Sequence, residues 1–360
     1  MSLLVIGTKH NPIKLDTDKN TEKDNISRIR SSRKTGPTPA DLTKGVLSGN
    51  ISSLSRAITL IESTHDGHAP LSRELIENCL PYSGKSVRIG ITGVPGVGKS
   101  TFIESLGTTL TKMGEKVAVL AVDPSSTISK GSILGDKTRM QELVKDKNAF
   151  IRPSPAGHSL GGVARKTRET IILCEAAGYT TLLIETVGIG QSETAVHGMV
   201  DFFLLLQLAG AGDELQGIKR GIMEMADAIA INKADGANLE QAHLAQAEFT
   251  RALHLYPPKK NGWTPKVLSC SATEKTGIAE IWELIKTFVA ENKRNGDFET
   301  NRKEQNKYWL IQSIEDRLKQ QFYQNKKVKI LLEEMIQSVV EGEISPFMAA
   351  EKLLAISREQ

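Results

Sequence analysis

The chain has 360 residues, of which 39% are hydrophobic and 24% charged, as is typical of a folded protein with one large domain and accessory elements. Its 46 lysines and arginines are interspersed with 42 aspartates and glutamates, which gives no reason to expect nucleic acid as a partner. No apolar run approaches the roughly 18 residues of a membrane helix, and the three cysteines are far apart. We therefore expect a cytoplasmic protein with reduced thiols and no membrane partner.

Residues 8–39 are rich in Lys, Asp, Asn, Ser and Arg and contain few large apolar side chains, so residues 1–39 are predicted to form a disordered tail. Acidic residues such as Asp16 and Glu22 argue against a mitochondrial transit peptide, although the Arg/Ser cluster at 28–33 keeps that alternative open. From 40 to 82, apolar residues recur at helical spacing, which predicts a pair of helices packed on the main domain. These residues are Leu42, Val46, Leu47, Ile51, Leu54, Ile58 and Ile61.

Residues 83–292 alternate short apolar runs with longer amphipathic ones, which predicts an α/β domain. The sheet should be mostly parallel with helices on both faces, and a ligand should then bind at the carboxyl ends of the strands. The predicted strands are Val87–Thr92, Lys116–Val122, Phe150–Arg152, Thr181–Ile184, Asp201–Leu206, Ala228–Ile231 and Lys266–Leu268.

A complete phosphate-binding loop pattern follows the first predicted strand and precedes a predicted helix. Its glycines allow backbone N–H groups to wrap phosphate oxygens, Lys99 adds a positive charge for the β- and γ-phosphates, and the Ser100 hydroxyl suits Mg²⁺. Thr101 is expected to support the α-phosphate. The loop consists of Gly93, Val94, Pro95, Gly96, Val97, Gly98, Lys99, Ser100 and Thr101.

Two acidic residues stand at or just beyond the ends of neighbouring predicted strands, namely Asp123 in "AVDPSS" and Glu185 in "IETVGIGQSE". Carboxylate oxygens suit the Mg²⁺ that accompanies a triphosphate, so both are candidate ligands of the ion or of its waters. Gly188 leaves room for a backbone N–H to meet the γ-phosphate. Lys99, Asp123 and Glu185 are therefore the candidate catalytic residues.

The stretch "INKADG" indicates which base is bound. The Asp235 carboxylate can accept from N1–H and the 2-amino group of guanine, two donors that adenine lacks, while the Lys233 stem covers the ring. Asn232 completes the NKxD pattern. The backbone of Ser271 and Ala272, after the last predicted strand, is a candidate donor to guanine O6. In order after a phosphate-binding loop, this pattern favours GTP and GDP over adenine nucleotides.

These stretches, together with "ILGDKTRM", "LGGVARKTRE", "CEAAGY" and "GDELQGIKRGIMEMAD", resemble the MeaB/ArgK family of P-loop GTPases of the SIMIBI class. The resemblance runs from about residue 42 to 288 and implies a GTPase chaperone for methylmalonyl-CoA mutase or a related acyl-CoA mutase. Such proteins gate the loading of adenosylcobalamin and protect the mutase from inactivation. The human relative is the cobalamin-disorder A protein. The resemblance matches Asp123 and Glu185 to the acids around the metal.

The resemblance also implies a switch loop at "GDELQGIK", where Asp213 and Lys219 carry opposite charges, although residue types alone fit a solvated loop equally well. It further implies that residues 293–360 form a C-terminal helical arm through which a homodimer assembles, and intramolecular packing is the alternative. The candidate apolar stripe on that arm comprises Trp309, Leu310, Ile314, Leu318 and Phe322. One departure is Gly157-His158, where relatives more often have Arg-Gly or Ser-Gly, which leaves the detail of that segment open.

Gly188 is followed by Ile189 and Gly190 rather than by a glutamine that would position water, and the role of the nearby Gln191 stays open. We therefore expect slow intrinsic hydrolysis that a partner stimulates. A nickel metallochaperone GTPase is an alternative, but the chain has no His-rich tract or CxxC motif. A kinase or ATPase associated with arginine and ornithine transport is disfavoured by the guanine pattern. A signal-recognition GTPase is disfavoured because the eight methionines are scattered.

Overall fold

The computed structural model describes residues 36–65, 67–122, 140–153, 160–186, 192–210 and 220–358. Seven strands form one sheet with the order β3-β2-β4-β1-β5-β6-β7, and all neighbouring strands are parallel. The expected α/β fold with a parallel sheet is therefore confirmed. The strands are β1 (Val87–Gly93), β2 (Val117–Val122), β3 (Ala149–Arg152), β4 (Thr181–Thr186), β5 (Phe202–Leu208), β6 (Ala228–Asn232) and β7 (Lys266–Ser269).

All seven predicted strands are present, and several extend further at their carboxyl ends than the apolar pattern indicates. Strand β1 continues to Gly93, β4 to Thr186 and β5 to Leu208. These additional residues still pair with the neighbouring strand, as Gly93 does with Leu206. Because every strand runs in the same direction, their carboxyl ends meet at one edge of the sheet, where the polar motifs of the sequence also fall.

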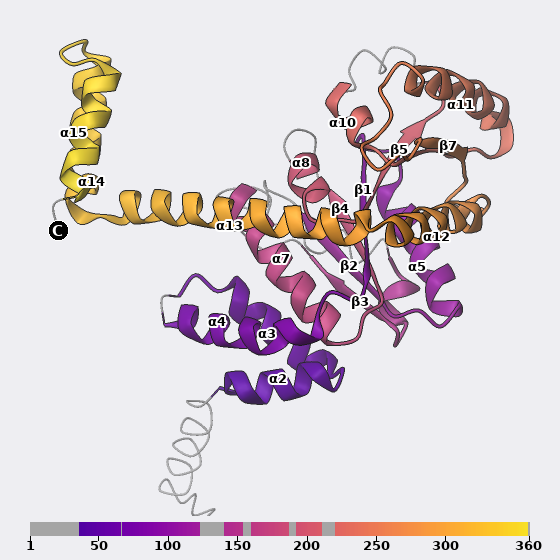
Figure 1. The fold of residues 1–360 in the computed structure, drawn as a ribbon, viewed down its shortest axis with the longest axis horizontal. Coiled ribbons are helices and arrows are strands. Elements are labelled where there is room, and N and C mark those ends of the chain that lie inside the picture. The colour runs from indigo at the N-terminus through magenta and orange to yellow at the C-terminus, as the bar shows by residue number, and fades with distance from the viewer. Residues whose placement is uncertain are drawn as a thin grey trace, which may run out of the picture.

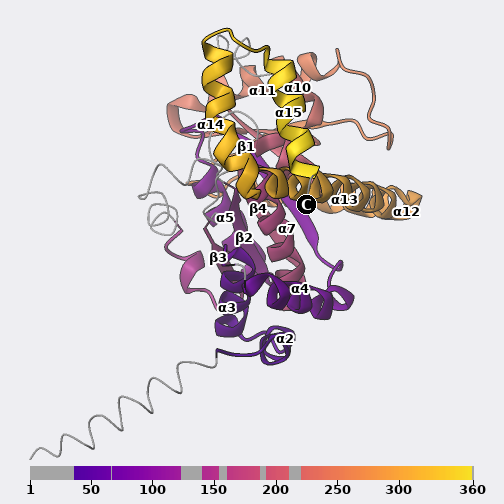
Figure 2. The ribbon, with the colours of Figure 1, turned by 90° about the vertical axis from the view of Figure 1, so that its left-hand side faces the viewer.

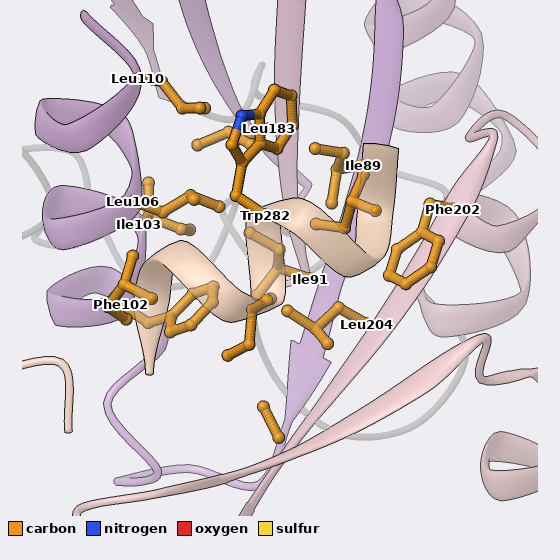
Figure 3. Packing of buried hydrophobic residues seen from close by; sticks show 14 of the residues in the cluster. Ile89, Ile91, Phe102, Ile103, Leu106, Leu110, Leu183, Phe202, Leu204 and Trp282 are labelled. Carbon is orange, nitrogen blue, oxygen red and sulfur yellow. The ribbon is translucent and has the colours of Figure 1, made fainter. Parts of the chain in front are cut away.

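One face of the sheet is covered by α5 (Lys99–Lys112) and α12 (Ile278–Asn295). Figure 3 shows how Ile89 and Ile91 of β1 face Phe102 and neighbouring apolar side chains of α5, with Trp282 of α12 beside them. All of these side chains except that of Trp282 are completely buried. This packing sets the first turn of α5 against the end of β1, and so positions the loop between them.

The opposite face is covered by α7 (Leu160–Ala176), α8 (Ser192–His197), α10 (Arg220–Met225) and α11 (Leu239–Leu253). Figure 2 shows the layers from a direction at right angles to that of Figure 1. Apolar residues of the same strands alternate between the two faces, as the period of two residues in a strand requires. Three short 3-10 turns complete the described connections, namely η1 (Leu80–Tyr82), η2 (Leu143–Lys145) and η3 (Gly236–Asn238).

The N-terminal segment contains three helices rather than the predicted pair: α2 (Pro39–Leu47), α3 (Ile51–Glu62) and α4 (His68–Cys79). The third helix forms because Leu75 and Cys79, one turn apart, are both fully buried in the core shared with α7. Their apolar face is short, which is why the spacing pattern missed it. The predicted tail lies almost wholly in residues 1–35, outside the described residues.

The C-terminal segment consists of α13 (Asp297–Gln324), α14 (Lys326–Val340) and α15 (Pro346–Arg358). Figure 1 shows α13 running along the domain and continuing past it to α14 and α15. The predicted apolar stripe divides: Trp309 is only 7% exposed and packs on the domain, whereas Leu310, Ile314 and Leu318 are exposed. The division of the chain into tail, N-terminal helices, GTPase domain and arm stays a prediction.

Among the described residues, no helix is both long and apolar enough to cross a membrane.

The three cysteines, Cys79, Cys174 and Cys270, are free and buried, as reduced structural thiols should be. Burial raises the pKa of the Cys270 thiol to about 12, so it stays protonated at neutral pH. In the part of the chain that the structure describes, no group of three or more His, Cys, Asp or Glu side chains is arranged to hold a metal ion.

A buried ionic network holds the amino edge of the sheet. Arg88 of β1 donates to both carboxylate oxygens of Glu175 on α7, over 2.8 and 3.0 Å. Glu175 also accepts from the Ser86 hydroxyl and from the backbone N–H of Gly84. Burial alone would raise the pKa of Glu175, but Arg88 and these hydrogen bonds outweigh it and lower the pKa below its usual value.

We expect Glu175→Gln to lower the free energy of unfolding by about 3 kcal/mol at pH 7, because Arg88 then lacks its buried counter-ion. A carboxylate with a lowered pKa stabilises the folded state above the unfolded pKa of about 4.5, and this contribution disappears as pH falls through the lower folded value. The difference in the free energy of unfolding between wild type and variant should therefore shrink as pH falls below 4.5. Urea unfolding between pH 7 and pH 3 measures it.

The matched control is Glu283→Gln, which removes a carboxylate from an exposed pair with Lys286 and should change stability by less than about 0.5 kcal/mol. A Glu175→Gln variant that is as stable as this control at pH 7 would contradict the network's role.

Candidate functional site

The loop between β1 and α5 lies at the carboxyl edge of the sheet and is closely packed against two other strands. Gly96 and Gly98 have φ values of +80° and +93°, in the left-handed region that favours glycine. A Cβ at Gly93 would lie 2.5 Å from the carbonyl oxygen of Leu206 on β5, and one at Gly98 would lie 2.8 Å from Nδ2 of Asn232 on β6. Packing therefore requires glycine at 93 and 98, and backbone conformation favours it at 96 and 98.

Lys99 begins α5, and its side chain turns back into the loop. Its Nζ donates to the carbonyl oxygens of Gly93, at 2.8 Å, and Val94, at 3.3 Å. Burial lowers the pKa of this ammonium group, while the carboxylates of Glu185 and Glu193 oppose that shift. The arrangement holds one cation inside the curve of the loop, where backbone N–H groups and the start of a helix favour an anion. Thr101 is exposed at the same helix start.

Ser100 and Glu185 come together beneath the loop. The Ser100 Oγ lies 3.4 Å from Oε1 of Glu185, and both residues are buried. Glu185 is positioned by β4, where it pairs in register with Ile91 of β1 and Ala121 of β2. A hydroxyl and a carboxylate oxygen at this separation are the hard ligands that Mg²⁺ prefers. The described residues therefore fit a magnesium ion bound together with nucleotide phosphates.

Asn232, at the end of β6, joins the phosphate loop to the loop after β7. Its Nδ2 donates to the carbonyl oxygen of Val97 over 2.7 Å, and its Oδ1 accepts from the backbone N–H of Ala272 over 3.2 Å. The next residue, Lys233, has a φ of +61° and donates from Nζ to the carbonyl oxygen of Gly96 over 2.9 Å. The Lys233 stem is thus fixed close to the loop.

Asp235 is held by the side chain of Ser271, a contact that the sequence pattern did not predict. The hydroxyl of Ser271 donates to Asp235 Oδ2 and accepts from the backbone N–H of Glu274 over 3.1 Å. Ser271 is completely buried. Ser271 therefore orients the Asp235 carboxylate, which restricts the direction from which this carboxylate can accept hydrogen bonds from a base. The sequence carries no separate signal for this contact, because a buried serine and a surface serine look alike.

The backbone N–H groups of Ser271 and Ala272 both have partners within the protein. Ser271 donates to the carbonyl oxygen of Thr276 over 3.0 Å, and Ala272 donates to Asn232 Oδ1. Their expected donation to guanine O6 therefore stays a prediction, and it requires one of these N–H groups to be shared with the base or released to it.

Several predicted site residues lie outside the described residues, so their placement stays a prediction. They are Asp123, Gly188, Asp213 and Lys219, together with Gly157, His158 and Gln191. Asp123 follows Val122, which ends β2 in register with Thr186 of β4.

Two further features of the site were not predicted. Glu193, in the first turn of α8, is 4% exposed and acts electrostatically on Lys99. A buried pair of hydroxyls joins the ends of β4 and β1, since Thr186 donates to Thr92 over 2.9 Å. The signal for Glu193 was its place shortly after the sequence stretch "VGIGQ", but sequence spacing alone does not reveal which way a carboxylate points.

The site has a glycine-rich loop between a strand and a helix, an inward-pointing lysine, and a serine beside a carboxylate at a strand end. These features define a nucleotide-binding protein of the P-loop class. A family model described as "Methylmalonyl Co-A mutase-associated GTPase MeaB" matches residues 54–327. The chain belongs to this MeaB family, and it is accordingly a GTPase that binds guanine nucleotide.

The names of similar proteins support this family assignment. A probable GTPase of Mycobacterium tuberculosis (strain ATCC 25618 / H37Rv) is 48% identical over 316 residues, which cover 88% of this chain and 94% of the relative. GTPase ArgK of Escherichia coli (strain K12) is 45% identical, with coverage of 86% and 93%. The mouse protein named "Methylmalonic aciduria type A homolog, mitochondrial" is 45% identical, with coverage of 87% and 78%.

A solved structure with a similar fold is described as "Crystal structure of LAO/AO transport system kinase". It is 38% identical in sequence, with a TM-score of 0.70, and the similarity covers 88% of this chain and 97% of that one.

Replacing Lys99 by Ala should abolish measurable binding of GTP and GDP while the fold survives, because the loop loses its inward cation. Titration calorimetry with both nucleotides measures the affinity, and circular dichroism checks the fold. The matched control is Lys112→Ala, at the far end of the same helix, which should bind as wild type does. A Lys99→Ala variant that binds GTP normally would show that this loop is not the nucleotide site.

Replacing Asp235 by Asn should weaken GTP binding about tenfold or more, since a hydrogen bond to a charged group contributes about 1.5–3 kcal/mol. The new amide can donate where the carboxylate accepted, so xanthosine triphosphate should become the preferred ligand. Competition between the two nucleotides for a fluorescent GDP analogue measures the preference. Glu240→Gln, an exposed change on the first turn of α11, serves as the control. An unchanged preference would remove Asp235 from the base site.

Proposed function

We propose that this GTPase is a chaperone of an adenosylcobalamin-dependent acyl-CoA mutase of the methylmalonyl-CoA type. It would gate the loading of the cofactor and protect the mutase from inactivation. The observation that carries the proposal is the match of residues 54–327 to a family described as mutase-associated. That range includes the phosphate loop, Glu185 and the guanine-reading loops, so the matched part of the chain contains the whole candidate site.

In the proposed mechanism, the loop residues bind the phosphates and Asp235 selects guanine. Lys99 neutralises charge on the β- and γ-phosphates while water attacks the γ-phosphorus and the bond to the β-phosphate oxygen breaks, which releases GDP and phosphate. Ser100 and Glu185, with Asp123, would hold Mg²⁺ directly or through water, and the ion would supply charge stabilisation of the phosphates. Intrinsic hydrolysis is expected to be slow until the partner completes the site.

The C-terminal arm supports a proposal of homodimer formation. Leu310, Ile314 and Leu318 of α13 are 51–64% exposed and recur every four residues, so they form an apolar row on the side of the helix that does not carry Trp309. A row of this kind is suited to packing against a second copy of the chain.

A second candidate function is that of a kinase in amino-acid transport. It is favoured by the similar solved structure, which is named as a transport system kinase. Incubation with labelled GTP separates the two candidates, because a kinase leaves the label on an acceptor protein whereas a GTPase releases it as free phosphate.

Two experiments test the mutase proposal with the full chain. Pull-downs from the native cell with a GTP analogue and with GDP, read by mass spectrometry, should recover an adenosylcobalamin-dependent mutase. Recovery of transporter subunits alone would contradict the proposal. In the second experiment, GTP hydrolysis is timed with and without saturating mutase, which should accelerate it.

The same assay tests the predicted switch loop. Lys219→Ala should leave GTP binding and slow intrinsic hydrolysis nearly unchanged but remove most of the acceleration by the mutase, because Lys219 is expected to pair with a carboxylate in only one nucleotide state. Lys303→Ala, an exposed change on α13, is the control and should be accelerated as wild type is. Equal acceleration of the Lys219→Ala variant would exclude this loop as the coupling element.

A further inference from the structure

Helix α13 contacts the GTPase domain along one face between Arg302 and Asp316. Arg302, Trp309 and Asp316 are spaced by seven residues, which is close to two helical turns, so they lie on the same side. At a rise of about 1.5 Å per residue they cover about 21 Å. Figure 1 shows α13 running along the domain beside α7 before it leaves toward α14.

The first of these contacts fixes α13 to the amino edge of the sheet. Arg302 pairs with both carboxylate oxygens of Asp201 over 2.8 and 2.7 Å, and it also donates to the carbonyl oxygen of Ser86. The Asp201 side chain is 1% exposed. One turn further on, Gln305 donates to the carbonyl oxygen of Val200 over 2.7 Å. This end of α13 is therefore firmly anchored.

The second contact joins α13 to α7 and α8 together. Trp309 donates from Nε1 to the carbonyl oxygen of Gly198, directly after α8, over 2.8 Å. The guanidinium of Arg168 on α7 stacks over the same indole, 4.0 Å from the ring centroid. A single buried side chain thus holds the end of one helix and the middle of another.

The third contact lies at the first turn of α7. A Cβ at Gly161 would be 2.9 Å from both carboxylate oxygens of Asp316, so the carboxylate approaches as closely as it does because this residue is glycine. A carboxylate near the N-terminus of a 17-residue helix interacts favourably with the helix dipole. Asp316 therefore contributes to holding the start of α7, which faces the carboxyl edge of the sheet.

Helix α8 continues the connection toward the nucleotide loop. Its last turn is held by Trp309 through Gly198, while its first turn carries the buried Glu193 that acts electrostatically on Lys99. The helix is only six residues long, so its two ends lie close together. The face of α13 is thereby connected with α8 by a hydrogen bond at Gly198, and α8 with the cation of the phosphate loop by the electrostatic effect of Glu193.

We propose that α13 is a rigid connection through which the C-terminal arm sets the rate of GTP hydrolysis. Trp309 is the positioning residue for α8, and Asp316 is the positioning residue for α7. This inference needs no partner protein, so it stands or falls separately from the mutase proposal. Whatever moves the arm, whether a second copy or another protein, then changes the arrangement of the two helices that border the nucleotide site.

The test compares Asp316→Asn, which keeps the size of the side chain and removes its charge, with Glu315→Gln on the neighbouring position of α13. Trp309→Phe is the second variant, because it keeps an aromatic ring and removes the donor to Gly198. Each full-length protein is assayed alone for single-turnover GTP hydrolysis, for GTP affinity by calorimetry, and for amide hydrogen exchange in peptides covering 160–168 and 192–198.

Asp316→Asn should speed amide exchange about fivefold in the peptide 160–168, and Trp309→Phe should do the same in the peptide 192–198. A fivefold change is expected when an interaction of about 1 kcal/mol is lost. The hydrolysis rate constant should fall about as much, while GTP affinity stays within about twofold. Glu315→Gln should match wild type in all three measurements. The proposal would be overturned if Asp316→Asn and Trp309→Phe hydrolysed GTP and exchanged amide protons at the same rates as this control. It would also be overturned if their GTP affinity fell as much as their hydrolysis rate.

Gly161→Ala provides an independent check, because its methyl group displaces the Asp316 carboxylate. This variant should show the same slowing as Asp316→Asn, and combining the two should add little further effect. Gly221→Ala, a helical glycine whose added Cβ would meet nothing within 4 Å, is the control for the alanine substitution itself. Additive effects of the two changes would show that Gly161 and Asp316 act separately.

Discussion

The side chain of Asn232 is the interaction on which the nucleotide site depends. It is 1% exposed and joins the phosphate loop, through Val97, to the loop that carries Ala272. Gly98 has no Cβ at the point where Asn232 Nδ2 approaches. This buried amide therefore holds the loop after β1 against the loop after β7. Because both of its polar atoms are used, a shift of either loop would leave a buried hydrogen-bonding group without its partner, which is costly.

The rest of the fold supports the strands that lead into the phosphate loop and to Glu185. Helices α5 and α12 pack beneath β1 on one face, and α7 and α8 support β4 on the other. At the amino edge, Arg88 and Arg302 are anchored by buried carboxylates, so the strands are fixed at the end remote from the ligand. The carboxyl edge is left to polar residues. A parallel sheet with both faces covered places its functional groups there because the ends of its strands are the part that helices do not cover.

The sequence predicted the seven strands and the phosphate loop well because both depend on local patterns: apolar runs of strand length, and glycines at fixed offsets from Lys99. It predicted less where burial on another element decides the outcome. The helix ending at Cys79 was not separated from its neighbours, and Trp309 was grouped with Leu310 although the two face different surroundings. Neither Glu193 nor the hydroxyl of Ser271 was assigned a role, since each acts on a residue far away in the chain.

The sequence by itself determined the class of nucleotide, the order of the elements and the residues that line the loop, because these follow from residue type and spacing along the chain. Only the tertiary structure decided how those residues are held. Tertiary packing joins Asn232 to Val97, brings Glu185 under Ser100, and sets Asp316 against Gly161. Each of these contacts connects residues at least 85 positions apart. Hydrogen bonds and packing over that sequence separation depend on how the strands and helices are arranged in space. Local periodicity does not specify that arrangement.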